Sequence, residues 1–210
     1  ATYTFSDTAY GSTCQMVYDL IHALGFENVL NTTVATCLYT GIVTDSGSFR
    51  FPKTTAATHK KVSILLQTGI DNAAIHHQLF NGNSYNSIQL LGKALQNLHM
   101  VTPKVSYIAL SHQELNEFHY QKGDTESIVN YGLSIKGIVM TAFFMENVAE
   151  KIIKISFRSV GNFDVNQFAR NHFNGGGHKN AAGGKSTLSL PETIQLFQQT
   201  LNQYPELCTV

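Results

Sequence analysis

Residues 175–184 read Gly-Gly-Gly-His-Lys-Asn-Ala-Ala-Gly-Gly, and this stretch constrains the chain more than any other. Three successive glycines carry no Cβ atoms, so a phosphate group can approach the backbone closely. Successive N–H groups can form an anion-binding nest, and a helix beginning at His178 would add the favourable dipole of its N-terminus. The alternative is a plain structural loop. Gly184-Lys185-Ser186 does not complete a Walker A loop, because that motif requires glycine at position 179, which is lysine.

The balance of charge narrows the range of partners. The 210 residues hold 14 Lys and Arg against 14 Asp and Glu, and the pI is about 7.3. Since excess positive charge supplies much of the affinity for duplex DNA, we expect no binding to duplex DNA. Residues 1–50 carry four acidic residues and one basic residue, whereas residues 151–185 carry six basic residues and one acidic residue. This asymmetry fits a metal-binding part and a phosphate-binding part, and chance clustering on solvated faces is the alternative.

Cysteine usage and hydropathy bear on the compartment. Cys14, Cys37 and Cys208 are widely spaced and form no C-x-x-C motif, so we expect a reducing, cytoplasmic environment. No apolar run approaches the about 18 residues that span a bilayer, and we expect no membrane partner. The first residues lack the basic and apolar regions of a signal peptide. Because the chain does not begin with Met, we expect a processed protein or a piece of a longer one.

The periodicity of apolar residues changes near residues 99–103. Before that point, apolar residues recur at helical spacing, as in the helix opened by Ser12 that includes Val17, Leu20 and Leu24. After Pro103, strand signals alternate with helical ones. We therefore expect an α/β fold with a helix-rich domain over residues 1–99 and a mixed-sheet domain over residues 100–210. The expected helices cover about 13–24, 32–39, 56–66, 72–80, 85–98, 124–133 and 191–201, together with a small helix after Ser111 and a helix from Asp164 through Ala169. The expected strands are 105–110, 138–145, 151–157 and 185–190.

The two strands around residues 138–157 read as a hairpin whose second arm alternates. Ile153, Ile155 and Phe157 lie on one face, and Lys154, Ser156 and Arg158 on the other. The guanidinium of Arg158 is a planar fork suited to phosphate. An ordinary exposed strand arginine is the alternative.

Asp45 ends an apolar run and is the candidate metal ligand. A carboxylate where an element ends can bind a divalent cation, and an aspartate that simply turns the chain before Gly47 is the alternative. One carboxylate does not make a metal site, and no H-x-x-x-H, H-x-D or D-x-D motif completes one. The other histidines receive no catalytic role, and no Ser/His/Asp triad is supported by the spacing.

Taken together, these segments resemble the DHH phosphoesterase superfamily, and within it the bifunctional oligoribonucleases and 3′-phosphoadenosine-5′-phosphate phosphatases. Family members begin with a histidine-and-aspartate motif, an isolated aspartate and the Asp-His-His triplet, and none of these occurs here. The chain is similar to the C-terminal portion of a DHH catalytic domain followed by a complete DHH-associated, substrate-binding domain. The matching segments are residues 11–13, 41–50, 133–137, 155–159 and 175–183.

This resemblance implies a site in which the first domain binds metal ions and the second domain binds the phosphate of the substrate. Asp45 matches the last metal-binding aspartate of a family that uses two divalent ions, usually manganese, to activate a water that attacks phosphorus. The expected substrate-binding residues are Arg158, Ser159, Gly175, Gly176, Gly177, His178 and Asn180, of which Ser159 and Asn180 match less closely.

The resemblance predicts a manganese-dependent phosphoesterase that hydrolyses short oligoribonucleotides and 3′-phosphoadenosine-5′-phosphate. We expect the 210 residues to be inactive alone, because the other metal ligands are missing. Two alternatives keep the superfamily and change the substrate, to a cyclic dinucleotide or to longer single strands. A third is a nucleotide- or RNA-binding module with no chemistry.

Overall fold

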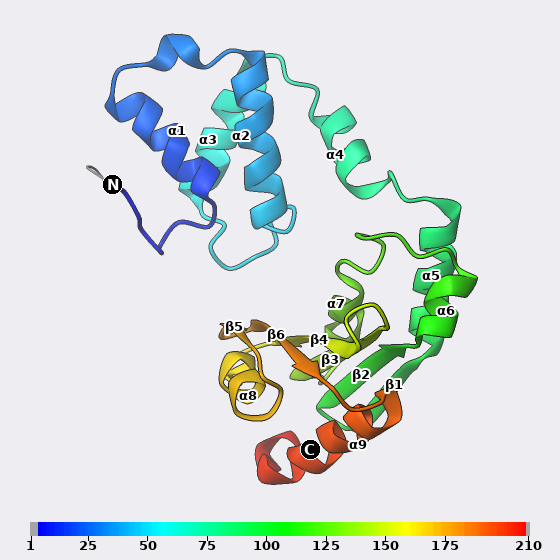
Figure 1. Cartoon of the computed structure of the whole chain (residues 1–210). Coiled ribbons are helices and arrows are strands. Elements are labelled where there is room, and N and C mark those ends of the chain that lie inside the picture. Colours follow the sequence, from blue (N-terminus) through cyan, green and yellow to red (C-terminus); the bar gives the residue numbers. More distant parts are fainter. Residues whose placement is uncertain (1–3, 209–210) are drawn as a thin grey trace. The chain divides into compact units, whose positions relative to one another are not determined.

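The computed structural model describes residues 4–208, and the chain divides into two compact units, Ala1–Gly82 and Asn83–Val210 (Figure 1). The sequence places the division later, between residues 99 and 100. The difference is helix α5 (Tyr85–Gln96), which buries Leu90 and Ala94 against the sheet of the second unit. The mixed α/β architecture is confirmed.

Helices make up the first unit, and polar residues begin them. Ser12, Asn31, Thr55 and Asp71 each accept a hydrogen bond from a backbone N–H of the following helix, which satisfies donors that the helix itself leaves unpaired. Tyr18 packs in the core with residues of the two longer helices, such as Leu38 and Leu65. The elements are α1 (Thr13–Ala23), η1 (Glu27–Val29), α2 (Thr32–Asp45), α3 (Ala56–Gln67) and α4 (Asn72–Phe80).

The helix expected after Ser12 is confirmed, but much of its apolar stripe is exposed. Val17, Leu20 and Leu24 are 41%, 45% and 55% exposed, whereas Gln15 and Tyr18 are buried. Helical spacing identifies an apolar stripe but not what covers it. The neighbouring helices pack along a different side of α1 and leave this stripe uncovered within the described residues.

A six-stranded sheet organises the second unit, in the order β1-β2-β3-β4-β6-β5. The pair β2–β3 is parallel, and all the other pairs are antiparallel. Strand β1 is a surprise, because its residues read as the end of a helix and a turn. The strands are β1 (Leu98–Thr102), β2 (Val105–Leu110), β3 (Met140–Asn147), β4 (Ile152–Ser159), β5 (Gly176–His178) and β6 (Ala181–Ser186).

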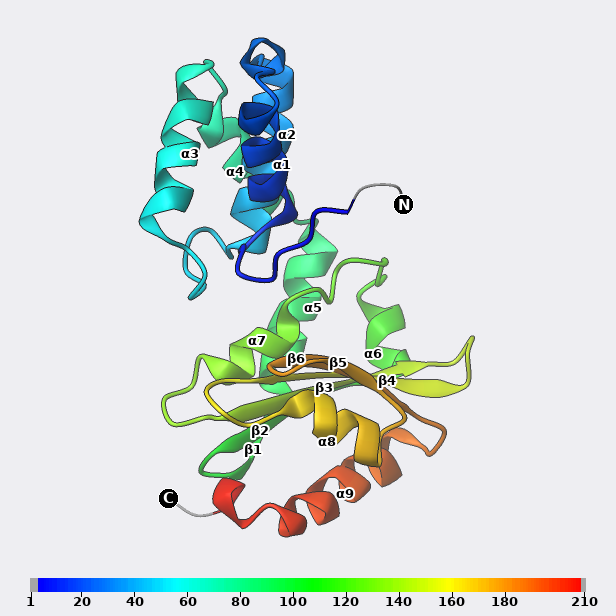
Figure 2. The ribbon, with the colours of Figure 1, turned by 90° about the vertical axis from the view of Figure 1, so that its left-hand side faces the viewer.

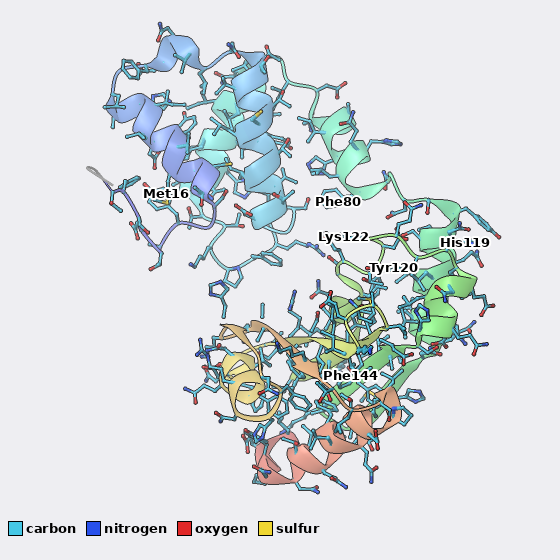
Figure 3. All side chains as sticks on the ribbon, in the orientation of Figure 1. Met16, Phe80, His119, Tyr120, Lys122 and Phe144 are labelled. Carbon is cyan, nitrogen blue, oxygen red and sulfur yellow. The ribbon has the colours of Figure 1, made fainter. Side chains whose placement is uncertain are left out.

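Helices cover both faces of this sheet (Figure 2). One face carries α8 (Val165–His172) and α9 (Leu190–Thr200), with an aromatic core that includes Phe157, Phe197 and Phe144. Figure 3 labels Phe144 among the side chains of this unit. The other face carries α5, α6 (His112–Glu117) and α7 (Ile128–Leu133). Two short 3₁₀ turns, η2 (Leu201–Gln203) and η3 (Pro205–Leu207), follow α9.

The hairpin of β3 and β4 is confirmed, and His178 ends strand β5 rather than beginning a helix. Residues 176–186 form a second hairpin of β5 and β6 at the edge of the sheet, because β6 pairs with β4 along six residues. None of the helices described over residues 4–208 combines the length and hydrophobicity that a bilayer-spanning segment needs.

Candidate functional site

Asp45 is the last residue of α2, and its side chain is exposed. Its Oδ2 atom accepts a 2.7 Å hydrogen bond from the hydroxyl of Ser12, the N-cap of α1. The two helices approach closely here, because Gly41 leaves space for Cys14 where a Cβ atom would collide with the sulfur. The carboxylate is therefore held in one orientation.

The chain after Asp45 turns through three successive left-handed residues. Gly47, Ser48 and Phe49 have φ angles of 57°, 57° and 65°, which is unfavourable for the two non-glycine residues. The buried Ser46 supports them, since its hydroxyl accepts a hydrogen bond from the N–H of Phe49. Phe51 packs over Gly47, where a Cβ atom would lie 2.5 Å from the ring.

The residues present do not make up a metal centre. Over residues 4–208, no group of three or more His, Cys, Asp and Glu side chains is arranged to hold a metal ion. Asp45 offers one carboxylate, and one of its oxygens is engaged by Ser12. Two closely spaced divalent ions need several more ligands, so the described residues do not fit a two-metal site by themselves.

In the second unit, the alternation of β4 is confirmed. Ile153, Ile155 and Phe157 are buried in the aromatic core on one face of the sheet. The cross-strand partners of Lys154, Ser156 and Arg158 on β3 are Met145, Phe143 and Thr141, which lie on the face covered by α7.

A cavity of about 380 Å³ opens over this polar row. Its volume lies within the range of small-molecule sites. Arg158, Ser156 and Lys154 form one wall, and Phe143 and Met145 add apolar surface. Residues 125–127, just before α7, and Val129 within α7 close the cavity.

Arg158 lacks an acidic partner. Within the described residues its guanidinium makes no ion pair, and its one hydrogen bond goes from Nη1 to the carbonyl oxygen of Phe157, at 3.0 Å. Partial burial lowers the pKa of Arg158 from its ordinary value, which shows that the surroundings disfavour the charge. A cation withdrawn from water without a counter-ion is stabilised when an anion enters.

The other charges of this cavity are less available. Lys154 forms an ion pair with Glu150 at 2.5 Å, and Glu126 also lines the cavity. Arg158 is therefore the strongest anion-binding group in the cavity.

The glycine hairpin lies in register with Arg158. Across neighbouring strands, Arg158 is opposite Ala181, and Ala181 is opposite His178. Two strand spacings separate the Cα atoms of Arg158 and His178 by about 10 Å. This register brings the two predicted residues into one region at the edge of the sheet. The side chain of His178 is exposed there.

The three glycines serve different purposes. A Cβ atom on Gly175 would overlap the carbonyl oxygen of Gly183, and one on Gly177 would lie 2.5 Å from the carbonyl oxygen of Ala181. These two positions need glycine for packing of the hairpin. Gly176 does not, because the nearest atom to its Cβ position is 3.5 Å away. The atoms nearest to that position belong to Arg170 and Asn166 of α8, at ordinary van der Waals distance.

Ser159 and Asn180 are engaged in the loop that follows β4. The hydroxyl of Ser159, which is buried, donates to the carbonyl oxygen of Phe163 at 2.7 Å. It accepts a 2.9 Å hydrogen bond from the Asn180 amide, which also donates to Gly161. Alternation places Ser159 on the opposite face from Arg158. These contacts shape the hairpin, and the structure does not bring the Ser159 hydroxyl into the Arg158 cavity.

Comparison with known proteins identifies the second unit. A family model described as the DHHA1 domain matches residues 103–206. The chain belongs to the DHH superfamily. Its DHHA1 domain therefore contains Arg158, the glycine hairpin and the 380 Å³ cavity, whereas Asp45 lies before it.

Individual relatives agree with this family. The chain is 32% identical to the bifunctional oligoribonuclease and PAP phosphatase NrnA of Bacillus subtilis, over 84% of this chain and 55% of that protein. It resembles the crystal structure of an exopolyphosphatase-related protein from Bacteroides fragilis, with a TM-score of 0.93 and 36% identity, over 97% of this chain and 60% of that one. The cyclic-di-AMP phosphodiesterase GdpP of B. subtilis is 28% identical over 93% of this chain and 29% of its own length.

The chain thus spans a little more than half of the oligoribonuclease relative. Sequence reasoning found Arg158 and the glycines of the DHHA1 domain but missed the segment that closes the cavity. Ser127 in that segment adopts a left-handed conformation and precedes α7 without capping it through its side chain. A break in helical periodicity around Gly123 is the signal that could have revealed this loop.

Proposed function

We propose that this chain is the nucleotide-binding part of a phosphoesterase that hydrolyses short oligoribonucleotides and 3′-phosphoadenosine-5′-phosphate. The observation that carries the proposal is Arg158, a partly buried cation with no acidic partner among the described residues, in register with the glycine hairpin. The similarity to an oligoribonuclease and PAP phosphatase supports the same substrate class.

In this proposal, Arg158 binds a phosphate group through two parallel N–H donors. Gly176 permits close approach of the ligand to the hairpin, and His178 supplies a further donor at the edge. A cavity of about 380 Å³ suits one nucleotide unit better than a long polymer. The zero net charge of the chain agrees with a short ligand, since long nucleic acids are bound mainly through excess positive charge.

The metal requirement is also a proposal. Asp45 would supply one carboxylate to a pair of manganese ions, and the remaining ligands would come from outside these 210 residues. Ions bound there would supply activation of a water molecule for attack on phosphorus. The contribution of this chain to that centre is a carboxylate held in place by Ser12.

Binding of 5′-phosphorylated diadenosine (pApA) to the 210-residue chain, measured by isothermal titration calorimetry, tests the anion site. We expect Arg158→Gln to weaken binding at least tenfold, because a charge-assisted pair is lost. Lys136→Gln, which removes a positive charge outside this cavity, is the matched control and should leave the affinity within twofold. Equal affinity of the wild type and Arg158→Gln would show that the site is not the phosphate-binding site.

Turnover is tested separately, with manganese present and release of AMP from the dinucleotide followed by chromatography. We expect no turnover by the 210 residues alone. Turnover that is abolished by Asp45→Ala would refute this expectation. A non-catalytic module, by contrast, predicts nucleotide binding that ignores manganese and survives Asp45→Ala. Binding that requires manganese and is lost in Asp45→Ala would argue against such a module.

A second candidate substrate is a cyclic dinucleotide, which the similarity to a cyclic-di-AMP phosphodiesterase favours. Cyclic-di-AMP has no terminal phosphate, whereas pApA does. Tighter binding of pApA than of cyclic-di-AMP supports the oligoribonuclease proposal, and the reverse order supports the cyclic dinucleotide.

A further inference from the structure

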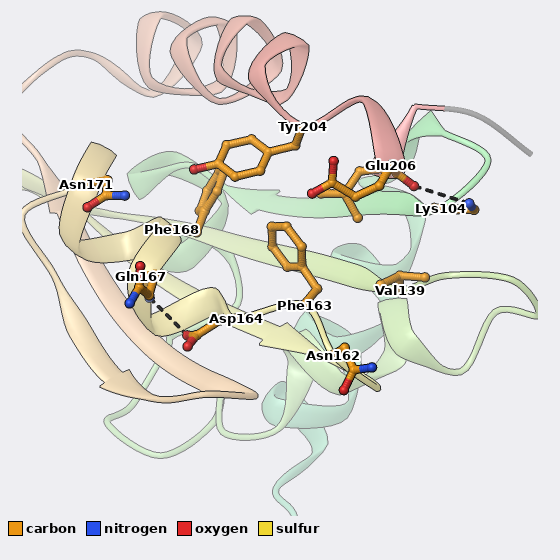
Figure 4. Close-up of a pocket in the computed structure, with 11 residues that line it drawn as sticks. Lys104, Val139, Asn162, Phe163, Asp164, Gln167, Phe168, Asn171, Tyr204 and Glu206 are labelled. Carbon is orange, nitrogen blue, oxygen red and sulfur yellow. Dashed lines mark hydrogen bonds between the residues drawn. The ribbon is translucent and has the colours of Figure 1, made fainter.

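A second cavity of the DHHA1 domain, of about 580 Å³, lies beside α8 and the C-terminal 3₁₀ turns (Figure 4). It is on the face of the sheet that carries α8 and α9, opposite to the face with the Arg158 cavity. Phe163, Phe168, Tyr204 and Val139 supply its apolar surface. The proposed function uses none of these residues.

The charges around this cavity disfavour a phosphate. Lys104 is its one cationic residue, and the Nζ atom already donates to the backbone carbonyl of Glu206 at 3.2 Å. The carboxylates of Asp164 and Glu206 lie on the same lining. Asp164 is committed to the N-terminus of α8, where it accepts hydrogen bonds from two backbone N–H groups. An anionic ligand would meet two carboxylates and one engaged ammonium group.

The polar groups that remain are neutral amides. Asn162, Gln167 and Asn171 border the cavity, and the Gln167 amide offers both donors and an acceptor. The Asn162 oxygen already accepts a hydrogen bond from Lys179, and the Asn171 side chain is hydrogen-bonded to Tyr204. The rings of Phe163 and Tyr204 meet edge to face, with centroids 5.6 Å apart, and both are partly exposed. Aromatic surface bordered by amides suits a flat heterocycle with donors and acceptors along its edge.

We propose that this cavity is a second ligand site, which binds an uncharged purine nucleoside. The volume of about 580 Å³ accommodates a base with its sugar. The two sites would then differ in chemistry, because the Arg158 cavity selects a phosphate and this one excludes it.

The two sites share structural elements. On α8, Gln167, Phe168 and Asn171 line the nucleoside cavity, while Asn166 accepts a 2.9 Å hydrogen bond from the N–H of Gly177. Asn162, at the cavity rim, accepts from Lys179 of the glycine hairpin at 3.3 Å. Asn166 and Asn162 therefore connect the elements around the nucleoside cavity to the glycine hairpin.

Titration of the ¹⁵N-labelled 210-residue chain with adenosine, followed by NMR, tests the site. We expect saturable shifts at Gln167, Phe168 and Asn171, with a Kd of roughly 0.1–1 mM for a ligand of this size. Gln167→Trp and Asn171→Trp fill the opening from exposed positions, and each should weaken binding at least tenfold. Gln199→Trp, on an exposed part of α9 outside the cavity, is the matched control and should bind as the wild type does.

Arg158→Gln separates this proposal from the proposed function. It should leave adenosine binding unchanged while it weakens binding of pApA. The proposal is overturned by an absence of saturable shifts, by equal binding in both blocked variants, or by loss of adenosine binding in Arg158→Gln. The last result would place adenosine in the phosphate-binding cavity.

Discussion

The hydroxyl of Ser12 donates a 2.7 Å hydrogen bond to Oδ2 of Asp45 and so joins the first turn of α1 to the last residue of α2. The hydroxyl oxygen of Ser12 also accepts a hydrogen bond from the backbone N–H of Cys14 and so caps α1. Ser12 is buried, so water cannot readily replace either bond. One hydroxyl therefore stabilises a helix and orients the candidate metal ligand.

We predict that Ser12→Ala lowers the free energy of unfolding by about 2 kcal/mol, since it removes a helix cap and a hydrogen bond to a charged group. Ser84→Ala is the matched control, because Ser84 caps α5 and makes no contact with a carboxylate that would add to the loss. It should cost about 1 kcal/mol. Urea unfolding measures both, and equal losses would show that the bond to Asp45 contributes nothing.

Adjacent glycines of the hairpin should respond differently to alanine. Gly175→Ala places a Cβ atom against the carbonyl oxygen of Gly183 and should destabilise the DHHA1 domain by about 2–4 kcal/mol. Gly176→Ala has room and should cost less than about 1 kcal/mol, yet weaken binding of pApA. Thermal unfolding and calorimetry distinguish the two effects. Wild-type affinity in a folded Gly176→Ala protein would argue against ligand approach at this glycine.

Replacement of Arg158 should remove binding without loss of stability. Its partly buried guanidinium has no acidic partner among the described residues, so Arg158→Met relieves an unpaired charge. We predict an unchanged or slightly raised melting temperature for this variant in the absence of ligand, together with loss of the stabilisation that pApA gives the wild type. A large fall in melting temperature without ligand would assign Arg158 a mainly structural role.

Acid should weaken the first unit through Asp19. Burial raises the pKa of Asp19, but hydrogen bonds from Lys61 and Tyr10 outweigh it, so the pKa is lowered overall. Because the folded pKa lies below the unfolded one, this stabilisation is present above about pH 4 and is lost as pH falls through the folded pKa. Lys61→Met should therefore reduce the acid sensitivity of α1–α3. Urea unfolding followed by circular dichroism measures the free energy of unfolding across this pH range. The same pH dependence in Lys61→Met and in the wild type would contradict the prediction.

Much of the fold follows from local signals in the sequence. Ser111 and Asp164 begin helices as expected, because capping depends on side chains a few residues apart. The alternation of β4 follows from one buried face and one partly exposed face. The hairpin after Gly175 could not be read in this way, since its strands depend on pairing with β4, more than twenty residues earlier in the chain. Strand β1 likewise forms because β2 lies beside it.

The candidate site was likewise predictable only where the residue types alone decide its chemistry. The chemistry of Arg158 and the glycines is visible in residue types, whereas the different duties of Gly175 and Gly176 depend on which atoms lie nearby. The apolar stripe of α1 illustrates the limit, because periodicity locates Val17 and Leu20 but not their neighbours.

The order of strands has a consequence for synthesis on the ribosome. Strands β1 to β4 are neighbours in the sheet in the order in which they leave the exit tunnel, and each can add to a growing edge as it emerges. The β5–β6 hairpin completes the sheet last, so a nascent chain that stops before residue 176 would have most of its aromatic core and none of the glycine edge. The strands with the least side-chain mass would thus be the last to join the sheet, and only α9 and the two 3₁₀ turns would emerge after them.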